Sequence, residues 1–428
     1  MAVRLCELVQ RPAHFIKKQV HDFKVIVTQN ALNSFSLQLS KPYDSIFIML
    51  LGANAVQLGF LNTIFMICRS LIATPVGWLA DRYNLRRIFL AGVGLFVFVP
   101  LIYALAHDWQ IIITAMILYA LALGLTFTAC SVVCAGSLNT LDRATGKNFC
   151  NFTASVAMVL APVLGSFLVT MFGGLTLEGI RSIYWIQLLG YGAIFVFIMF
   201  QFKGSIRAKN NQRTLKSKKS LLQDFREIFG GKAVLKRWLL VSGLIWMPYI
   251  MVMPYTPVFA HEFKGADQYT LGLMISAIAL IQIFLGIPIG RLADRFGRKK
   301  IIYIITPFYY ASNLILILAP SPPFLLLVGF LQGFYMPLII LTETMTSELV
   351  PINQMGRWMG VVGLFQGLFT IPAPLIGGLI WTHINPAFVF LFPVILDVLL
   401  RIPILATVPE TLNSKIARSQ TEHKDVVT

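Results

Sequence analysis

The sequence predicts an all-α membrane protein whose twelve transmembrane helices form two pseudo-symmetric bundles of six. Three observations support this fold class. Hydrophobic residues make up 57% of the 428 residues and charged residues only 12%, whereas a soluble domain carries about 25% charged residues. Apolar segments of membrane-spanning length recur along the chain, and short motifs of the first half return in the second. Lipid is therefore the expected environment.

Twelve apolar segments divide the chain. A helix needs about 20 residues to cross the hydrocarbon core of a bilayer, and each segment is at least that long. The first is the most polar, because several amide and hydroxyl side chains interrupt it. We expect the spans at residues 22–50, 54–77, 87–106, 110–136, 150–172, 180–202, 235–260, 269–291, 300–319, 322–346, 356–382 and 386–407.

The spans and the charges between them define five regions. The linker between the two bundles carries nine Lys and Arg residues, which would keep it in the cytoplasm and are of the kind that anionic lipid attracts. The regions are a cytoplasmic N-terminal segment at 1–21, an N-terminal six-helix bundle at 22–202, the basic cytoplasmic linker at 203–234, a C-terminal six-helix bundle at 235–407 and a cytoplasmic tail at 408–428.

Basic residues set the expected orientation. The net charge is +17, and most Lys and Arg lie in the short gaps that fall on one face of the membrane when the spans alternate. Because cytoplasmic loops carry such an excess, we expect both termini in the cytoplasm and a multi-pass protein in the plasma membrane. The same distribution argues against nucleic-acid binding, whose footprint is a polar, basic domain.

Repeated motifs indicate two equivalent halves. Because each half holds an even number of helices, both enter the membrane in the same orientation, as in parallel repeats related by an axis along the membrane normal. Four matches recur at a spacing of 212 or 213 residues: GxLADR at 77–82 and 290–295, Leu-Gly at 58–59 and 271–272, Pro-Tyr at 42–43 and 254–255, and APxxG at 161–165 and 373–377.

The GxLADR motif and the basic residues after it resemble the loop motif of the major facilitator superfamily. The copies occupy 77–88 and 290–301, each after the second helix of its half. The second is similar to the full family pattern, whereas the first has Asn84 and Leu85 where Gly and a basic residue are usual. The resemblance covers nearly the whole chain. It implies the family's twelve-helix fold and secondary transport by alternating access, in which the two halves rock about a site near the midplane.

This resemblance implies a gating role for both loop motifs. Each motif acid would face the positive N-terminus of a helix in the other half, and the arginines would bridge to neighbours in one conformation only. Helix capping and cytoplasmic anchoring are the alternative roles. The predicted gating residues are Gly77, Asp81, Arg82, Arg86 and Arg87 in the first copy, and Gly290, Asp294, Arg295, Gly297 and Arg298 in the second.

A proline–glycine pair recurs in spans five and eleven. Pro bends a membrane helix and small residues let a neighbour approach, so Pro162, Gly165, Pro374 and Gly377 are expected to shape helix packing. The first pair partly resembles a motif of drug and metabolite antiporters, which favours export. Span four lacks the arginine that many proton-coupled exporters carry, and this departure argues against that type of coupling.

Ionisable residues inside the spans are candidates for coupling, because they are costly in lipid and usually face a cavity or a partner. Glu343 in span ten is the first choice, and a helix-end pair with a loop base is its alternative. Arg69 in span two is a second candidate, which could equally reach a carbonyl group or Asp81 by local pairing.

Two further candidates have a partner of opposite charge nearby in sequence. Asp44 lies three residues after Lys41, and Asp397 lies four residues before Arg401. Both spacings place the charges on one helical face. Asp44, Asp397 and Arg401 therefore remain coupling candidates for which a structural pair is the favoured interpretation.

The resemblance also indicates which helices line a central cavity, namely the first and fourth of each half. Their polar and aromatic residues recur at spacings of three or four, which share a helical face. Amides and aromatic rings suit a partly polar organic molecule, although each aromatic alone is more often a packing residue. The candidates are Gln29, Asn30 and Asn33 in span one, Trp246 and Tyr249 in span seven, and Gln332 and Tyr335 in span ten.

Enzyme and metal motifs do not occur in the sequence. It has no GxxxxGK[ST] phosphate loop, no HExxH and no GxSxG, and its six His residues are dispersed. Cys130 and Cys134 share a helical face but have no His or carboxylate beside them, so packing is the favoured role. We therefore expect no cofactor, no metal and no enzymatic activity.

These expectations define one leading function and two alternatives. The leading function is a secondary transporter that works as a monomer in the bilayer and moves a small organic solute by alternating access, with proton-coupled efflux as the preferred form. An uptake permease for a nutrient such as a sugar or organic acid is the first alternative. A non-transporting membrane receptor or scaffold on the same fold is the second.

Overall fold

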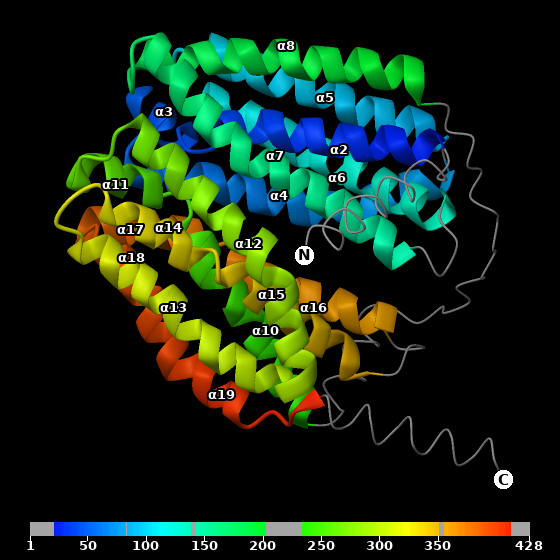
Figure 1. Cartoon of the computed structure of the whole chain (residues 1–428), viewed down its shortest axis with the longest axis vertical. Coiled ribbons are helices and arrows are strands. Elements are labelled where there is room, and N and C mark those ends of the chain that lie inside the picture. Colours follow the sequence, from blue (N-terminus) through cyan, green and yellow to red (C-terminus); the bar gives the residue numbers. More distant parts are fainter. Residues whose placement is uncertain (1–20, 83, 138–142, 203–232, 351–354, 412–428) are drawn as a thin grey trace, which may run out of the picture. The chain divides into compact units, whose positions relative to one another are not determined.

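The computed structural model describes residues 21–82, 84–137, 143–202, 233–350 and 355–411, and among them it contains helices and no strand (Figure 1). Within these ranges the side chains at 73–74, 77–82, 85, 128–137, 143–148 and 356–357 lie outside the description. Most of the predicted N-terminal segment, linker and tail also lie outside it. The prediction of an all-α membrane protein is confirmed.

The described part of the first half contains seven helices (Figure 1). They are α2 (His21–Ser40), α3 (Asp44–Leu50), α4 (Ala55–Arg82), α5 (Leu85–Leu105), α6 (Ile111–Ser137), α7 (Arg143–Met171) and α8 (Leu177–Gln201).

The second half contains α-helices and one π-helical turn among its described residues. They are α10 (Ala233–Val252), α11 (Thr256–Lys264), α12 (Gln268–Phe296), α13 (Arg298–Leu318), α14 (Phe324–Gln332), α15 (Tyr335–Glu348), α16 (Met355–Thr370), α17 (Ala373–His383), α18 (Phe388–Leu396), the π-turn η2 (Asp397–Arg401) and α19 (Ile402–Ala406).

These helices match the predicted spans. In the described ranges, ten helical stretches are long and apolar enough to cross a membrane, and Ile111–Phe127 is a shorter apolar helix at the place of span four. The polar first span corresponds to α2 and α3. The described residues therefore account for all twelve expected segments, consistent with a multi-pass membrane protein.

Several spans consist of two consecutive helices. The first breaks between α2 and α3 at the turn that contains Pro42, and the seventh breaks between α10 and α11 at Pro254. Because proline lacks a backbone N–H and restricts the residue before it, a helix tends to end there. The repeated Pro-Tyr pair thus interrupts the first helix of each half at the equivalent position.

The helices group into two compact units. The first holds the described residues up to Gly52 and from Ile67 to Phe202, and the second holds Ala53–Met66 and the described residues from Ala233 onward. The first turns of α4 therefore pack within the second unit. There the Tyr255 hydroxyl lies 3.2 Å from the Ala55 carbonyl oxygen and 2.6 Å from that of Pro374.

The core of the first unit joins α2, α5 and α8. Val25 and Ile26 of α2 pack with buried aromatic and aliphatic side chains of the other two helices. Full burial of one such side chain contributes about 1.5–3 kcal/mol. The partners are Phe89, Val93 and Phe96 of α5 and Tyr191, Ile194 and Ile198 of α8.

Two buried tryptophans anchor the core of the second unit. Trp238 of α10 and Trp358 of α16 are 0% and 1% exposed. Their indole N–H groups donate to the hydroxyl and the carbonyl oxygen of Thr346, at 2.9 and 2.8 Å. Burial of the rings contributes apolar area, and the two hydrogen bonds satisfy their only polar groups. Together they fix α10 and α16 against α15.

The same glycine contact occurs in each unit. A Cβ atom added at Gly165 of α7 would clash with the carbonyl oxygen of Leu39 in α2, and one added at Gly377 of α17 would lie 3.3 Å from that of Met251 in α10. Gly377 follows Gly165 by 212 residues, as Met251 follows Leu39. The sequence repeat is therefore a repeat of helix packing, as expected for small residues in membrane helices.

Candidate functional site

A buried ion pair lies in the last span. Asp397 and Arg401 both belong to η2 and are 3% and 2% exposed. The guanidinium of Arg401 donates from Nε to Asp397 Oδ1 and from Nη2 to Oδ2, the latter at 2.6 Å. The two residues expected to pair therefore form a bidentate contact inside the membrane-spanning segment, where both charges are removed from water.

Helix α13 supplies the remaining partners of this pair. The Tyr310 hydroxyl donates to Asp397 Oδ2, and the Arg401 Nη2 group donates to Thr306 Oγ1 at 3.3 Å. Arg401 Nη1 is buried without a hydrogen-bond partner among the described residues. We call these four residues, Asp397, Arg401, Tyr310 and Thr306, the Asp397 cluster.

A stack of tyrosines lies next to this cluster. Tyr335 of α15 has its ring centroid 4.3 Å from that of Tyr309 in α13 and 5.3 Å from that of Tyr249 in α10. The Tyr335 hydroxyl donates to the carbonyl oxygen of Ile245. The structure thus places Tyr249 and Tyr335, two predicted cavity residues from spans seven and ten, face to face.

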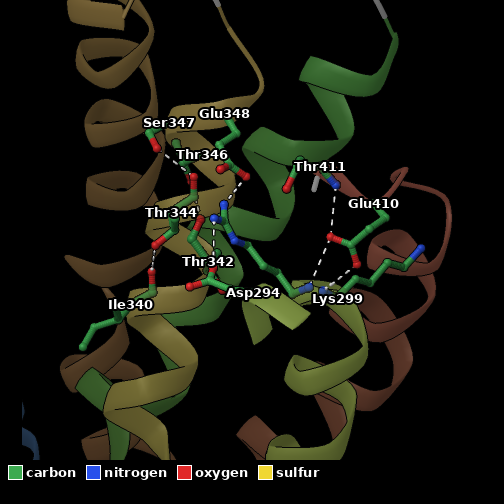
Figure 2. Close-up of polar contacts among 11 residues, drawn as sticks. Asp294, Lys299, Ile340, Thr342, Thr344, Thr346, Ser347, Glu348, Glu410 and Thr411 are labelled. Atoms are coloured by element: carbon green, nitrogen blue, oxygen red, sulfur yellow. Dashed lines mark hydrogen bonds and ion pairs between the residues drawn. The ribbon is translucent and has the colours of Figure 1, made fainter. Parts of the chain in front are cut away.

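A second charged cluster occupies the end of α12, the start of α13 and the end of α15 (Figure 2). Arg298 pairs with Glu348, and its Nη2 atom lies 3.4 Å from Asp294 Oδ1. The side chains of Arg298 and Glu348 are 8% and 9% exposed, whereas Asp294 is 68% exposed. We call Asp294, Arg298 and Glu348 the Arg298 cluster. Its buried pair, Arg298 with Glu348, ties the start of α13 to the end of span ten.

Glu410 caps the start of α13 (Figure 2). Its carboxylate accepts from the backbone N–H groups of Arg298 and Lys299, at 3.2 and 3.0 Å. A carboxylate at this end satisfies free N–H groups and interacts favourably with the helix dipole. Lys299 Nζ in turn donates to the carbonyl oxygens of Ala406 and Val408, both at 2.7 Å.

Gly297 has the backbone conformation that this contact needs. Its φ is +101°, and a Cβ atom there would lie 2.8 Å from Glu410 Oε2. Only glycine adopts such a conformation readily. At Gly290 an added Cβ would meet no described atom within 4 Å, and Arg295 is exposed with its guanidinium 5.4 Å from the centre of the Phe296 ring.

The first copy of the loop motif is described in part. Gly77, Asp81 and Arg82 lie in α4, but their side chains are outside the description. Arg86 donates from Nη2 to the carbonyl oxygen of Met199 at 3.0 Å, while Arg87 is exposed. The Asn84 side chain accepts from the backbone N–H of Arg86 and caps α5. Asn84, which replaces the usual glycine, thus begins the next helix.

The predicted cavity residues of span one lie on the buried side of α2. Gln29 is 2% exposed, and Asn30 Nδ2 lies 3.3 Å from both the carbonyl oxygen and the sulfur of Cys150. Asn33 Oδ1 is buried, and no described residue forms a hydrogen bond with it. In the second unit Trp246 packs against the core and Gln332 is buried at the end of α14.

The other coupling candidates are spread over both units. Glu343 on α15 and Arg69 on α4 are exposed. Asp44 accepts a 3.0 Å hydrogen bond from the Tyr184 hydroxyl, whereas Lys41 Nζ is 4.0 Å away. Neither Glu343 nor Arg69 belongs to the Asp397 cluster. Within the described residues, no three His, Cys, Asp or Glu side chains gather closely enough to hold a metal ion.

Four partners were missed by the sequence analysis. Glu348, Tyr310 and Tyr184 contact residues far away in the chain, and no local pattern marks them. Glu410 lies after the last predicted span, in the segment Val-Pro-Glu-Thr at 408–411, and its position in the sequence does not mark it as a partner of α13.

The fold and the buried intramembrane charges together indicate the class of protein. Membrane-spanning helices in two repeated bundles, with ionisable groups buried inside them, are typical of secondary transporters. The family model of the Major Facilitator Superfamily matches residues 27–270 and 264–428. The chain belongs to this family and is a multi-pass membrane transporter.

Curated relatives include transporters and resistance proteins. The chain is 24% identical over 179 residues to the "Tetracycline resistance protein, class B" of Escherichia coli, which covers 41% of the chain and 44% of that protein. This match therefore spans less than half of that relative. The chain is 23% identical over 367 residues to the "Uncharacterized transporter YybO" of Bacillus subtilis (strain 168), covering 81% and 77%.

A third relative also aligns over most of its length. It is the "Probable 4-methylmuconolactone transporter" of Cupriavidus pinatubonensis, 21% identical over 343 residues, which cover 77% of the chain and 76% of that protein.

Solved structures show the same fold. A variant of the nucleoside transporter NupG superimposes with a TM-score of 0.74 at 14% identity, covering 90% of this chain and 99% of that one. The D-xylose-proton symporter gives 0.70 at 15% identity, covering 91% and 99%. At these identities the likeness establishes the architecture.

Proposed function

We propose that this chain moves a small, partly polar organic solute across the plasma membrane by alternating access and exports it in exchange for protons. The observation that carries the proposal is the family match across both halves, since the fold is that of proteins whose two bundles rock about a shared site. Resistance to tetracycline, after which one relative is named, fits removal of a compound from the cell.

The Arg298 cluster and Glu410 have a mechanical role in this proposal. They join the ends of α12, α13 and α15 and the segment after α19 through a buried ion pair and a capped helix start. These ends would therefore move as one piece. This supports the gating role of Gly290, Asp294, Arg295, Gly297 and Arg298, and by the repeat that of Gly77, Asp81, Arg82, Arg86 and Arg87.

Each unit contributes groups that suit a partly polar ligand. In the first, the buried Asn33 Oδ1 atom is an acceptor for a ligand hydroxyl or amine, near Asn30 and Gln29 on the same helix. In the second, Tyr249 and Tyr335 offer aromatic faces, with Trp246 and Gln332 on neighbouring turns. A ring that carries hydrogen-bonding substituents fits both sets.

The proposal includes the orientation and the assembly. We place both termini in the cytoplasm because the basic loops fall on one side, and we take the monomer as the working unit because one chain holds both halves.

Uptake of a nutrient is the second candidate, and one match supplies a possible solute for it. The match to the "Probable 4-methylmuconolactone transporter" covers 76% of that protein, whereas the match to the tetracycline resistance protein covers 44% of its length. A small lactone or organic acid is therefore the alternative solute, carried inward together with protons.

Flux into proteoliposomes tests the proposal. Purified protein is reconstituted and offered tetracycline, a nucleoside, D-xylose and a muconolactone in turn, under a pH gradient of either sign. Exchange with protons predicts accumulation in vesicles with an acidic lumen, whereas proton symport predicts it in vesicles with an alkaline lumen. Protein-free vesicles are the control. Flux of none of these solutes, with or without a gradient, would contradict transport and favour the receptor alternative.

A further inference from the structure

The Asp397 cluster has features that a purely structural ion pair does not need: deep burial, a π-helical turn and unpaired polar atoms. We propose that Asp397 is the group that binds and releases the coupling proton, with Arg401 as its resident counter-cation. This inference rests on the proposed function. It assigns coupling to a site within the second unit, between η2 and α13, rather than to the exposed Glu343 of α15.

The energetics of the pair give the first argument. Two charges taken out of water lose several kcal/mol of hydration each, and well-packed apolar side chains of similar volume are often as stable or more so. Asp397 and Arg401 are nevertheless 3% and 2% exposed inside an apolar span. In a membrane helix such groups most often mark ion or proton pathways.

The backbone gives an independent argument. The two charges lie on a π-helical turn, and the Ile402 N–H donates to the Asp397 carbonyl oxygen five residues before it. Such turns are rare and occur frequently at functional sites. Here the π-turn lies at the residues that carry the charges, so a change in their pairing is directly linked to the shape of span twelve.

Unpaired polar atoms near the pair give a third argument. In the described part of the chain, Arg401 Nη1 and Asn313 Oδ1 are buried without partners, and the Tyr309 hydroxyl lies near the Asn313 side chain without a well-directed hydrogen bond. Each buried, unsatisfied group costs about 1–3 kcal/mol. Groups of this kind are where a water molecule binds in a protein interior. Water bound at these atoms would extend the polar contacts of the Asp397 cluster along α13.

The described titratable groups near the pair are one cation and several tyrosines. Arg401 is the cation that faces Asp397, and the tyrosine hydroxyls lie around the two charges and the neighbouring rings. They come from each helix packed around the site: Tyr303, Tyr309 and Tyr310 of α13, Tyr335 of α15 and Tyr249 of α10.

The proton balance explains how binding would change the conformation. A proton from one aqueous side converts the Asp397 carboxylate to the acid, and the pair changes from neutral to a net charge of one. Arg401 is then a buried cation without its counter-ion, which is strongly unfavourable. A conformational change that lets water reach the guanidinium would remove this cost. Release of the proton to the opposite side of the membrane then restores the ion pair.

Infrared spectroscopy tests proton binding without any solute. Difference spectra between alkaline pH and a mildly acidic pH, at which exposed aspartates stay ionised because their ordinary pKa is about 3.9, are recorded on the whole chain in lipid, with aspartate labelled by carbon-13. We expect a protonated-carboxyl band in the wild type and in Asp108→Asn, which removes an exposed loop acid. The band should be absent in Asp397→Asn. An unchanged band in Asp397→Asn, or no titrating aspartate in the wild type, would overturn the proposal.

A double variant keeps the test possible if the single variant does not fold. Asp397→Asn leaves the Arg401 cation unpaired, whereas Asp397→Asn with Arg401→Gln removes both charges at similar volume. If the single variant does not fold, the double variant takes its place. A band that persists in the folded double variant would overturn the assignment.

Transport then separates this inference from the proposed function. With a one-unit pH gradient, one-for-one exchange accumulates solute about tenfold, the factor that corresponds to one pH unit. The folded Asp397 variant should lose this accumulation and keep solute exchange at equal pH. Gradient-driven accumulation equal to that of the wild type would overturn the inference and leave transport intact. Absence of all solute flux in the wild type contradicts the proposed function, whereas the infrared result stands independently.

Discussion

At the scale of single residues, Arg298 shows how burial decides the strength of a charge pair. It contacts one buried carboxylate, Glu348, and one exposed carboxylate, Asp294. An exposed pair contributes about 0–1 kcal/mol, because water and salt screen it. A buried charge whose partner is removed is not solvated by water, and the free energy of unfolding then falls by about 3–5 kcal/mol. The two contacts of one guanidinium are therefore unequal.

Matched amide substitutions test this difference. We expect Glu348→Gln to lower the free energy of unfolding by about 3–5 kcal/mol, because the exposed, solvent-screened Asp294 is then the one described carboxylate left to the buried Arg298. Asp294→Asn should change it by no more than about 1 kcal/mol. Thermal unfolding in detergent, followed by tryptophan fluorescence, measures both. Equal losses in the two variants would contradict the burial argument.

Gly297 offers a second residue-scale prediction. Gly297→Ala places a Cβ atom 2.8 Å from Glu410 Oε2 at a residue with φ of +101°. A non-glycine residue in such a conformation costs about 1–3 kcal/mol, so the melting temperature should fall. The control is Gly290→Ala in the same motif, where an added Cβ meets no described atom within 4 Å. A fall at Gly290 as large as that at Gly297 would refute the proposed role of Gly297.

At the scale of helices, close contacts at glycine set the distance between neighbours. Gly165 touches the backbone of α2, and Gly377 lies against Tyr255 and the backbone of α10. In lipid, helices associate through packing rather than through the hydrophobic effect, so close approach at small residues matters. The two glycines occupy equivalent positions in the repeat, and a larger residue at either position should therefore be unfavourable.

Alanine substitutions test this packing. Gly165→Ala and Gly377→Ala should each destabilise the protein by about 1–3 kcal/mol, since the added methyl group would displace the α2 backbone at Gly165 and the Tyr255 ring at Gly377. Gly192→Ala in α8 is the control, because no described atom lies within 4 Å of an added Cβ there. That change should instead stabilise by about 0.5–1 kcal/mol through helix propensity. Unfolding temperatures of the three variants are compared, and a stabilised Gly165→Ala variant would disprove the close contact.

The helices and several local ion pairs could be predicted from the sequence. The spans follow from apolar length, and the pairs of Asp397 with Arg401 and Arg298 with Asp294 follow from helical spacing of four. The breaks of spans one and seven at Pro42 and Pro254 could have been predicted from proline alone. The π-turn could not, because no residue preference marks it.

Contacts between side chains of different helices could not be predicted from the sequence. Glu348, Glu410 and Tyr310 reach Arg298, the start of α13 and Asp397 only because of the order in which the helices pack. Spacing in the sequence contains no information about that order. Sequence analysis therefore identified one side of each cluster and missed the other.

At the scale of the whole molecule, the described residues form two units whose boundary cuts α4. Ala53–Met66 packs with Tyr255 and α17, whereas the chain from Ile67 belongs to the first unit. A Cβ atom at Gly378 would lie 2.5 Å from the Ala55 carbonyl oxygen, so this contact is tight. Alternating access would require the two units to exchange contacts as rigid bodies.

Distances between pairs of spin labels measure whether the two units move as rigid bodies. Spin labels are placed at the exposed Gln201 of the first unit and Lys300 of the second, after the five native cysteines are replaced. A pair at Lys300 and Thr407, within the second unit, is the control. We predict two distance populations between the units whose proportions shift with pH and transported solute, while the control distance stays constant. A single distribution that neither condition shifts would contradict alternating access.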